Sequence, residues 1–225
     1  FHNPSILSLS FARKICVIIP YIAKGVQMRM IAATQNIHKI REMEAITADF
    51  GIKIVTQAEA GLPPTDVEET GSTFEENSAL KARTICHLSG LPAIADDSGL
   101  AVDALGGAPG VYSARYAGPE ADDQANNAKL LAALADVPKA GRTGRYVSVI
   151  TLAYPDGRLL TARGECTGTL LTAPRGTGGF GYDPLFVPDG TTLTFAEMSA
   201  EQKNRISHRA RALARLREIL EENEV

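Results

Sequence analysis

The amino-acid sequence predicts an α/β fold built on a mixed β-sheet, and two patterns lead to this prediction. From Met28 onward, short apolar runs typical of buried strands alternate with longer stretches whose apolar residues recur at helical spacing, as in α/β domains. Residues 145–154 and 159–169 are two long strand-like runs separated by a Pro-Asp-Gly turn. A connection this short joins antiparallel neighbours, so the sheet is predicted to be mixed.

The first predicted elements alternate regularly between strand and helix. Residues 30–33 are a short apolar strand, and residues 36–50 place apolar side chains at helical spacing before a glycine ends the helix. A second strand follows over 52–56. After a loop with two prolines, Thr-Phe-Glu-Glu at 73–76 predicts a capping box that opens a helix reaching residue 89.

Two carboxylates mark the third predicted strand. A glycine and a proline end the preceding helix, and the apolar residues 93–95 form a strand that stops at Asp96 and Asp97. The remaining predicted elements are a glycine-rich loop over 106–110, a helix over 120–134, the hairpin, and a terminal helix over 210–220 with its leucines on one stripe.

Composition restricts the class of protein. The 225 residues carry a net charge of −3 and 44% hydrophobic side chains, which suits one compact unit without the basic surface that a nucleic acid polymer requires. Three widely spaced cysteines form no zinc-type pairs, which favours reduced thiols and a cytoplasmic location. The apolar run at 15–23 is shorter than the ~20 residues of a membrane helix, so no membrane partner is expected.

Residues 1–27 are expected to lie outside the functional domain. The chain begins with Phe1, a basic Arg-Lys pair precedes the short apolar run, and the sequence around Ala23 is a poor signal-cleavage site. We therefore predict an N-terminal extension over 1–27 and a single domain over 28–225.

Adjacent Asp96 and Asp97 are the most informative candidate site. Two negative charges at the end of a buried strand require a cation that offsets their repulsion, which predicts a metal site. Ser98 follows them directly. The same residues also suit a strand-closing turn in which Asp and Ser side chains bond the local backbone.

Two lysines lie where they could bind an anion. Residues 34–39 begin a helix whose unpaired N–H groups and positive dipole end suit a phosphate, with Lys39 one turn into the helix. Glu69 precedes the next helix, and Lys81 lies on a face from which it could reach a phosphate. An ordinary helix cap and a solvated surface lysine are the alternative explanations.

A glycine-rich segment over 175–184 suits a flat ligand. Its glycines nominally match the dinucleotide-binding fingerprint, but Pro184 prevents the helix that this fingerprint requires after its last glycine. The open backbone beside Phe180 and Tyr182 suits the close approach of a base, or a tight turn between strands.

Further cations occur near the end of the chain. Residues 199–202 predict a capping box for a short helix that contains Lys203, and Ser207 is placed to cap the terminal helix. His208 and Arg209 then fall in the first turn, where cations oppose the helix dipole. Their placement predicts a nearby anion or base acceptor, unless they are a tolerated surface pair.

Six sequence blocks occur in order across residues 30–220: Thr34-x-Asn36-x-x-Lys39, Glu69-Thr-Gly-x-Thr-Phe-x-Glu-Asn77-x-x-x-Lys81-Ala, Ala95-Asp-Asp-Ser-Gly-Leu, Pro109-Gly-Val-Tyr-Ser-Ala-Arg115, Gly178-Gly-Phe-Gly-Tyr-Asp-Pro184 and Ser207-His-Arg209. Together they resemble the Ham1-type nucleoside triphosphate pyrophosphatases. Gln35 departs from this pattern, because many relatives have glycine there, and residues 1–27 have no counterpart.

The resemblance implies Mg²⁺-dependent hydrolysis of ITP, dITP and XTP to the monophosphate and pyrophosphate, which keeps these nucleotides out of DNA and RNA. It also implies a long curved mixed β-sheet with flanking helices, two lobes around a central substrate cleft, and a homodimer. By the same resemblance Glu69 and Asp97 bind the metal, and Asp97 accepts the proton. The residues implied to bind substrate are Thr34, Gln35, Asn36, Ile37, His38, Lys39, Lys81, Ser98, Phe180, Gly181, Tyr182, Asp183, Lys203, His208 and Arg209.

The chemistry of the bases suggests how such a site selects its substrate. Hypoxanthine and xanthine carry an oxygen at C6 where adenine carries an amino group, so backbone N–H groups and a cationic His208 or Arg209 would match only the oxygen. Leaving buried polar groups unpaired discriminates by up to ~10⁴-fold. Asp96 is expected to support the metal indirectly while Asp97 acts on the water, but the residues alone leave open which of the two aspartates is the direct metal ligand.

Two other classes of protein remain open on the residues alone. A nucleotide sensor could use the same loops without catalysis, but it would not need the acid cluster of Glu69, Asp96 and Asp97. A phosphatase of the Asp-x-Asp type fits less well, because Asp96 and Asp97 are adjacent.

Overall fold

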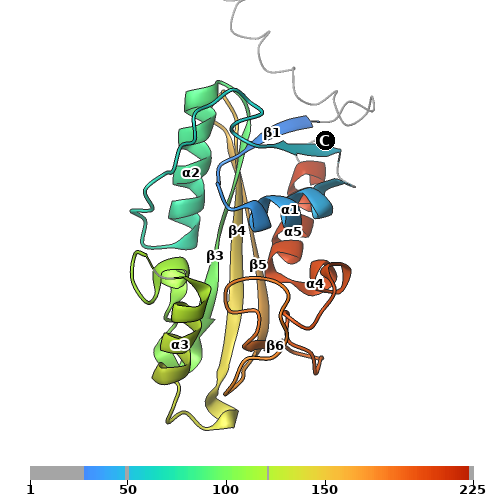
Figure 1. Ribbon diagram of the computed structural model, residues 1–225. Helices are drawn as coiled ribbons and strands as arrows, with labels where there is room; N and C mark the ends of the chain where they lie inside the picture. The colour runs from blue at the N-terminus through green and yellow to red at the C-terminus, as the bar shows by residue number, and fades with distance from the viewer. Residues whose placement is uncertain (1–27, 49–50, 121, 223–225) are drawn as a thin grey trace, which may run out of the picture.

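A computed structural model describes residues 28–48, 51–120 and 122–222, so the predicted extension over 1–27 lies outside the described residues (Figure 1). Six strands form one sheet in the order β2-β1-β3-β4-β5-β6. The strands are β1 (Met28–Ala32), β2 (Ile52–Val55), β3 (Ala93–Val102), β4 (Thr143–Ala153), β5 (Leu159–Leu170) and β6 (Phe186–Pro188). β1 is parallel to β2 and β3, whereas the pairs β3–β4, β4–β5 and β5–β6 are antiparallel. The predicted mixed sheet is confirmed.

Helices cover both faces of this sheet. The helices are α1 (Ile37–Thr47), α2 (Phe74–Ser89), α3 (Asp123–Ala133), α4 (Ala200–Ile206) and α5 (His208–Glu222), with short 3-10 helices η3 (Asp103–Leu105), η4 (Gly110–Arg115) and η5 (Lys139–Gly141). In Figure 1, α2 and α3 lie to one side of the long strands, and α1, α4 and α5 lie to the other. Flanking helices around an α/β sheet are therefore confirmed, with α3 beginning three residues later than predicted and α5 two residues earlier.

Alternating strand residues build a separate apolar core on each face. Met30 packs with Met43 of α1 and Leu213 of α5, whereas the next residue, Ile31, packs with Ile85 of α2. This division follows from the two-residue period of a strand, which sends successive side chains to opposite faces. A third core under α3 and β6 supports the far end of the long strands.

Helix ends follow the predicted capping residues, with one correction. Thr73 accepts the N–H of Glu76 at 3.1 Å, and Gly90 ends α2 with a φ of +65°. The capping box at this helix is only half formed, because the Glu76 carboxylate accepts the N–H of Ser72 instead of that of Thr73. The capping box of Ser199 with Gln202 is complete.

The prediction that the third strand stops at the two aspartates is wrong. β3 continues to Val102 and pairs with β4 along its whole length, with Asp96 opposite Ile150 and Asp97 opposite Val149. A continuous partner strand satisfies the backbone on either side of the carboxylates. The strand-closing turn is therefore excluded, and the two side chains lie in the middle of the sheet.

Helix α5 lies unusually close to β5. A Cβ added at Gly164 would lie 2.2 Å from the Ala212 nitrogen and 2.3 Å from the His208 oxygen, both of them backbone atoms of α5. Gly164→Ala is therefore expected to push α5 away from the sheet and lower the free energy of unfolding by about 2 kcal/mol. Urea denaturation would measure this change. Thr167→Ala, on the exposed side of β5, is the control, and equal midpoints for the two variants would contradict the close packing.

Two further sequence predictions can be compared with the described residues. Cys86 and Cys166 are buried free thiols, as expected for reduced cysteines. A search of the described ranges finds no helix with the length and apolarity to cross a membrane.

Candidate active site

The candidate site lies where β1 ends beside β3. β1 pairs with β3 only at Ala93 and Ile94, so the next residues of β3 lie just beyond the carboxyl end of β1. The chain leaves β1 there and enters α1, whose N-cap is Asn36. The parallel β1–β3 pair therefore places the start of α1 beside Asp96 and Asp97.

Asp96 and Asp97 point to opposite faces of the sheet, as consecutive strand residues do. Asp97 contacts Lys81 of α2, with 2.6 Å between Nζ and Oδ1. Asp96 contacts Arg209 of α5, with 2.9 Å between Nη2 and Oδ2. The adjacent carboxylates therefore belong to two different polar networks, and each has a protein cation as its partner.

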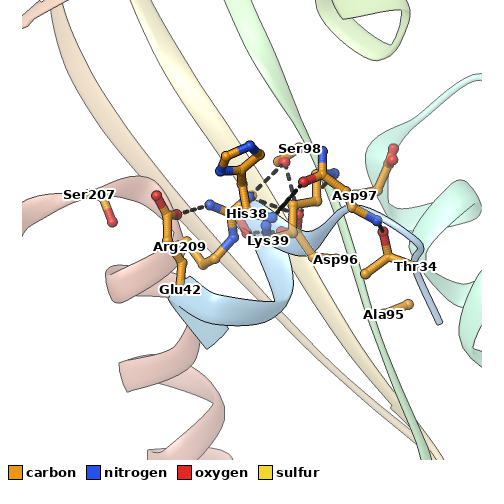
Figure 2. A network of polar contacts seen from close by, with 12 residues as sticks. Thr34, His38, Lys39, Glu42, Ala95, Asp96, Asp97, Ser98, Ser207 and Arg209 are labelled. Atoms are coloured by element: carbon orange, nitrogen blue, oxygen red, sulfur yellow. Dashed lines mark hydrogen bonds and ion pairs between the residues drawn. The ribbon is translucent and has the colours of Figure 1, made fainter. Parts of the chain in front are cut away.

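Asp96 lies at the centre of a network of polar contacts (Figure 2), and its own side chain and that of Arg209 are fully buried. Lys39 Nζ lies 3.0 Å from Asp96 Oδ2, and the hydroxyls of Ser98 and Ser148 donate to the carboxylate at 2.9 and 2.6 Å. Burial opposes ionisation of Asp96, but Arg209 and Lys39 outweigh it and hold the pKa of Asp96 well below its usual range. This ionised carboxylate therefore positions two cations, and the supporting role of Asp96 toward a metal stays a prediction.

Glu42 of α1 completes this network on the other side of Arg209. Its carboxylate accepts hydrogen bonds from Arg209 and from Lys203, the latter at 2.8 Å. Lys203 in turn donates to Asp183 at 2.7 Å. Lys203 of α4 and Arg209 in the first turn of α5 thus both have anionic partners, as the position of Arg209 at the positive end of the helix dipole predicted.

The Asp97 network joins two carboxylates through one lysine. Lys81 Nζ lies 2.8 Å from Glu69 as well as 2.6 Å from Asp97, and Arg115 donates to the other oxygen of Glu69 at 2.8 Å. Burial raises the pKa of Asp97 to about 6. At Glu69 the effect of burial is outweighed by Lys81 and Arg115, which lower its pKa to about 2. Asp97 is therefore the better proton acceptor near neutral pH.

The pair of Glu69 and Asp97 fits a magnesium ion. Asp97 Oδ2 is buried without a hydrogen-bond partner, so one oxygen ligand is available beside Glu69. Mg²⁺ is commonly held by only one or two protein carboxylates, with phosphate oxygens and waters as its other ligands. Within the described ranges no group of three or more His, Cys, Asp or Glu side chains suits a metal, so an all-protein cage is not present there.

A cavity of about 110 Å³, lined by both charged and aromatic side chains, lies on the Asp96 side of the site. The predicted site residues that line it are Asn36, Lys39, Ser98, Phe180, Gly181, Tyr182, Asp183, Lys203, His208 and Arg209. They come from four separate parts of the chain, which only the fold brings together. The Phe180 ring stacks on His38 with 5.3 Å between ring centroids, and the Tyr182 hydroxyl donates to the Ser113 carbonyl at 2.8 Å.

His208 is not the cationic donor that the sequence suggested. Its ring is buried and stacked on Tyr146 with 4.6 Å between centroids. Burial and the adjacent Arg209 hold the pKa of His208 well below its usual value, so the ring is neutral. Nδ1 of His208 and Nε of Arg209 are buried without hydrogen-bond partners.

The predicted site residues around the start of α1 make local contacts, and of residues 34–39 only Asn36 and Lys39 line the cavity. The Asn36 side chain accepts the N–H groups of His38 and Lys39 at 3.0 and 3.2 Å, so the ordinary N-cap is present. Thr34 Oγ1 accepts the N–H of Asn36 at 3.1 Å. Gln35 donates to Gln57 at 3.0 Å, and Ile37 is half exposed. Lys81 is buried in its ion pairs and is not a solvated surface lysine.

Several residues with polar roles were not predicted. Glu42 and Ser148 hold the Asp96 network, and Arg115 holds Glu69. Tyr146 and Asp123 line the cavity. Arg115 lay within a recognised sequence block, but the other four carry no local signal, since their partners are distant in the sequence.

The chain is similar to a family and to solved structures over most of its length. The model of the Ham1 family matches residues 30–219. A dITP/XTP pyrophosphatase of Symbiobacterium thermophilum is 54% identical over 86% of this chain and 95% of that protein. A dITP/XTP pyrophosphatase of Xanthomonas campestris is 52% identical over 85% of this chain and 96% of that protein.

Among solved structures, a HAM1 protein from Coxiella burnetii superposes with a TM-score of 0.78 at 42% identity, covering 87% of this chain and 100% of that chain. The Staphylococcus aureus Ham1 protein superposes with a TM-score of 0.76 at 40% identity, covering 87% and 99%. Sequence blocks, fold and relatives thus agree over the same residues, and the chain belongs to the Ham1 family.

Proposed function

We propose that this chain hydrolyses the non-canonical purine nucleoside triphosphates ITP, dITP and XTP to the monophosphate and pyrophosphate. The observation that supports this most directly is a cavity on the Asp96 side of β3 together with a buried Lys81 that joins Glu69 to Asp97, the next residue of the same strand. The names of the relatives, dITP/XTP pyrophosphatase, supply the substrate class. Such an enzyme removes these nucleotides from the pool used for DNA and RNA synthesis.

In the proposed reaction, Asp97 accepts a proton from a water molecule. The water oxygen forms a bond to the α-phosphorus, the bond from that phosphorus to the bridging oxygen breaks, and pyrophosphate leaves with the electron pair. Lys39 and Lys81 offer positive charge to the phosphates. The start of α1, which carries Lys39, adds its unpaired N–H groups. We propose Mg²⁺ as the cofactor, held by Glu69 and Asp97, where it would neutralise charge on the phosphate oxygens.

The nucleoside is proposed to occupy the cavity. Its lining offers Phe180 for stacking, and Lys203, His208 and Arg209 toward the polar edge of the base. A neutral His208 can still donate one N–H to an oxygen at C6, whereas the amino group of adenine would leave that donor unpaired. The proposal also includes a homodimer in the cytoplasm, and light scattering on the purified protein would measure the oligomeric state.

One experiment tests the proposed function against its alternatives. The protein is incubated with Mg²⁺ and ITP, dITP, XTP or each standard triphosphate, and the phosphorus-containing products are identified. Monophosphate and pyrophosphate from the non-canonical purines are expected. Orthophosphate would indicate a phosphatase, and binding without turnover would indicate a nucleotide sensor.

His208→Ala is expected to narrow the preference for ITP over ATP about tenfold, because one donor to the C6 oxygen is lost. Since the pKa of His208 is lowered, the ring is neutral across pH 6 to 8, and the wild-type preference should show no step in that range. The ratio of kcat/KM for the two substrates is the measurement. His87→Ala, at an exposed histidine, is the control. An unaltered ratio in His208→Ala would show that His208 takes no part in base recognition.

A further inference from the structure

The segment that carries Phe180 is held from across the cavity by helix α3. The Gly181 N–H donates to Asp123 Oδ2 at 2.6 Å, and the Gly181 carbonyl accepts from Asn127 Nδ2 at 2.8 Å. Asp123 and Asn127 are four residues apart on α3, so they lie one helical turn apart on the same face. The backbone N–H and C=O of Gly181 are therefore both held by one helix. The two residues that hold them lie 58 and 54 positions earlier in the sequence.

The position of Gly181 makes this contact informative. Gly181 lies between Phe180 and Tyr182, and all three residues line the cavity together with Asp123. Its φ of +62° is a conformation that residues other than glycine rarely adopt. The backbone that α3 holds thus belongs to the turn that orients the two aromatic side chains.

Helix α3 is itself firmly attached on the far side of the cavity. Asn126 donates to the Ala114 carbonyl at 3.1 Å and accepts the Ala117 N–H at 2.8 Å. These contacts fix α3 to η4, which lies against β3. The Asp123 and Asn127 contacts therefore join the two sides of the cavity, one formed by η4 and α3 and the other by the segment over 180–183.

We propose that Asp123 and Asn127 are positioning residues for the nucleoside, an inference that rests on the proposed function. They hold the Gly181 peptide and so preform the aromatic wall of Phe180 and Tyr182 before the base arrives. A preformed wall avoids the entropic cost of ordering a glycine-rich turn on binding. The role concerns the nucleoside end of the substrate, and the reacting phosphates lie closer to Lys39 and Asp97.

Asp123→Ala tests this role, because it removes the acceptor for the Gly181 N–H. We expect the KM for ITP and the inhibition constant of its product IMP to rise about tenfold, with kcat within about twofold, since a charge-assisted bond is lost from the binding site alone. Asp123→Asn keeps an acceptor oxygen and should restore most of the affinity for IMP. Asn127→Ala should change the affinity in the same direction and carries the test if Asp123→Ala does not fold.

Asp122→Ala is the matched control. Asp122 caps α3 by accepting the Ala125 N–H at 2.8 Å, so its removal weakens the helix start without removing a bond to Gly181. An unchanged inhibition constant for IMP in Asp123→Ala, or an equal rise in Asp122→Ala, overturns the positioning role. A wild-type protein that releases no pyrophosphate from dITP would instead reject the proposed function, so the two failures are distinguishable.

Discussion

Asp97→Asn is expected to lower the rate of pyrophosphate release from dITP about 10³-fold at saturating Mg²⁺, because an amide cannot accept the proton of the attacking water. The substitution conserves shape, and the bond from Lys81 to Glu69 at 2.8 Å does not involve Asp97. Steady-state release of pyrophosphate is the measurement.

The folded state should tolerate this substitution. Since burial raises the pKa of Asp97 to about 6, above its usual value, ionisation of this carboxyl opposes folding as pH rises toward 6 and beyond. A neutral Asn removes this penalty, so Tm at pH 7.5 is not expected to fall. Asp103→Asn, at a half-exposed carboxylate beyond the end of the same strand, is the control for activity. Full activity in Asp97→Asn would exclude its catalytic role.

Arg209→Met is expected to produce the largest loss of stability, about 3–5 kcal/mol, because it removes the buried cation that Asp96 and Glu42 share and leaves each carboxylate with a single lysine. Arg209 is fully buried and contacts both Asp96 and Glu42. Urea denaturation at pH 7.5 measures the change. Arg215→Met, at an exposed arginine paired with Glu218, is the control and should leave the stability close to that of the wild type.

The effect of Arg209→Met should also depend on pH in a defined direction. In the wild type, Arg209 lowers the pKa values of Asp96 and Glu42, so the stability it confers is present above their unfolded values and is lost as pH falls through the folded ones. Without Arg209 these carboxyls bind protons at higher pH, and protonation reduces the free-energy cost of burying them without the guanidinium. The loss of stability should therefore be smaller at pH 5 than at pH 7.5. A loss below about 1 kcal/mol at pH 7.5 would show that Lys39 and Ser148 suffice for Asp96.

The acidic pair at 96 and 97 shows where reasoning from sequence was sufficient and where it was not. Adjacent carboxylates after an apolar run correctly indicated a site that needs positive charge. The strand was predicted to stop there, because local sequence does not reveal that β4 pairs with it throughout. It was this strand pairing that separated the two carboxylates, one on each face of the sheet, and so assigned Asp97 to Lys81 and Asp96 to Arg209.

Local patterns determined most elements, because the forces that set them act within a few residues. Period-two and helical spacing located the hairpin and the helices, and Asn36, Thr73, Ser199 and Gly90 marked helix ends through bonds or backbone angles of their own turn. The six ordered blocks likewise identified the family, since they are properties of the chain itself.

Only the tertiary structure decided which charges and donors meet. Glu42 lies more than 160 residues from both Lys203 and Arg209, and Asp123 lies 58 residues from Gly181. The protonation of His208 follows from its burial against Tyr146 and beside Arg209, and no sequence pattern encodes that environment. The sequence by itself thus determined the elements, the family and most of the chemical groups, whereas packing determined their partners and pKa values, because electrostatic and hydrogen-bond energies depend on distance and burial.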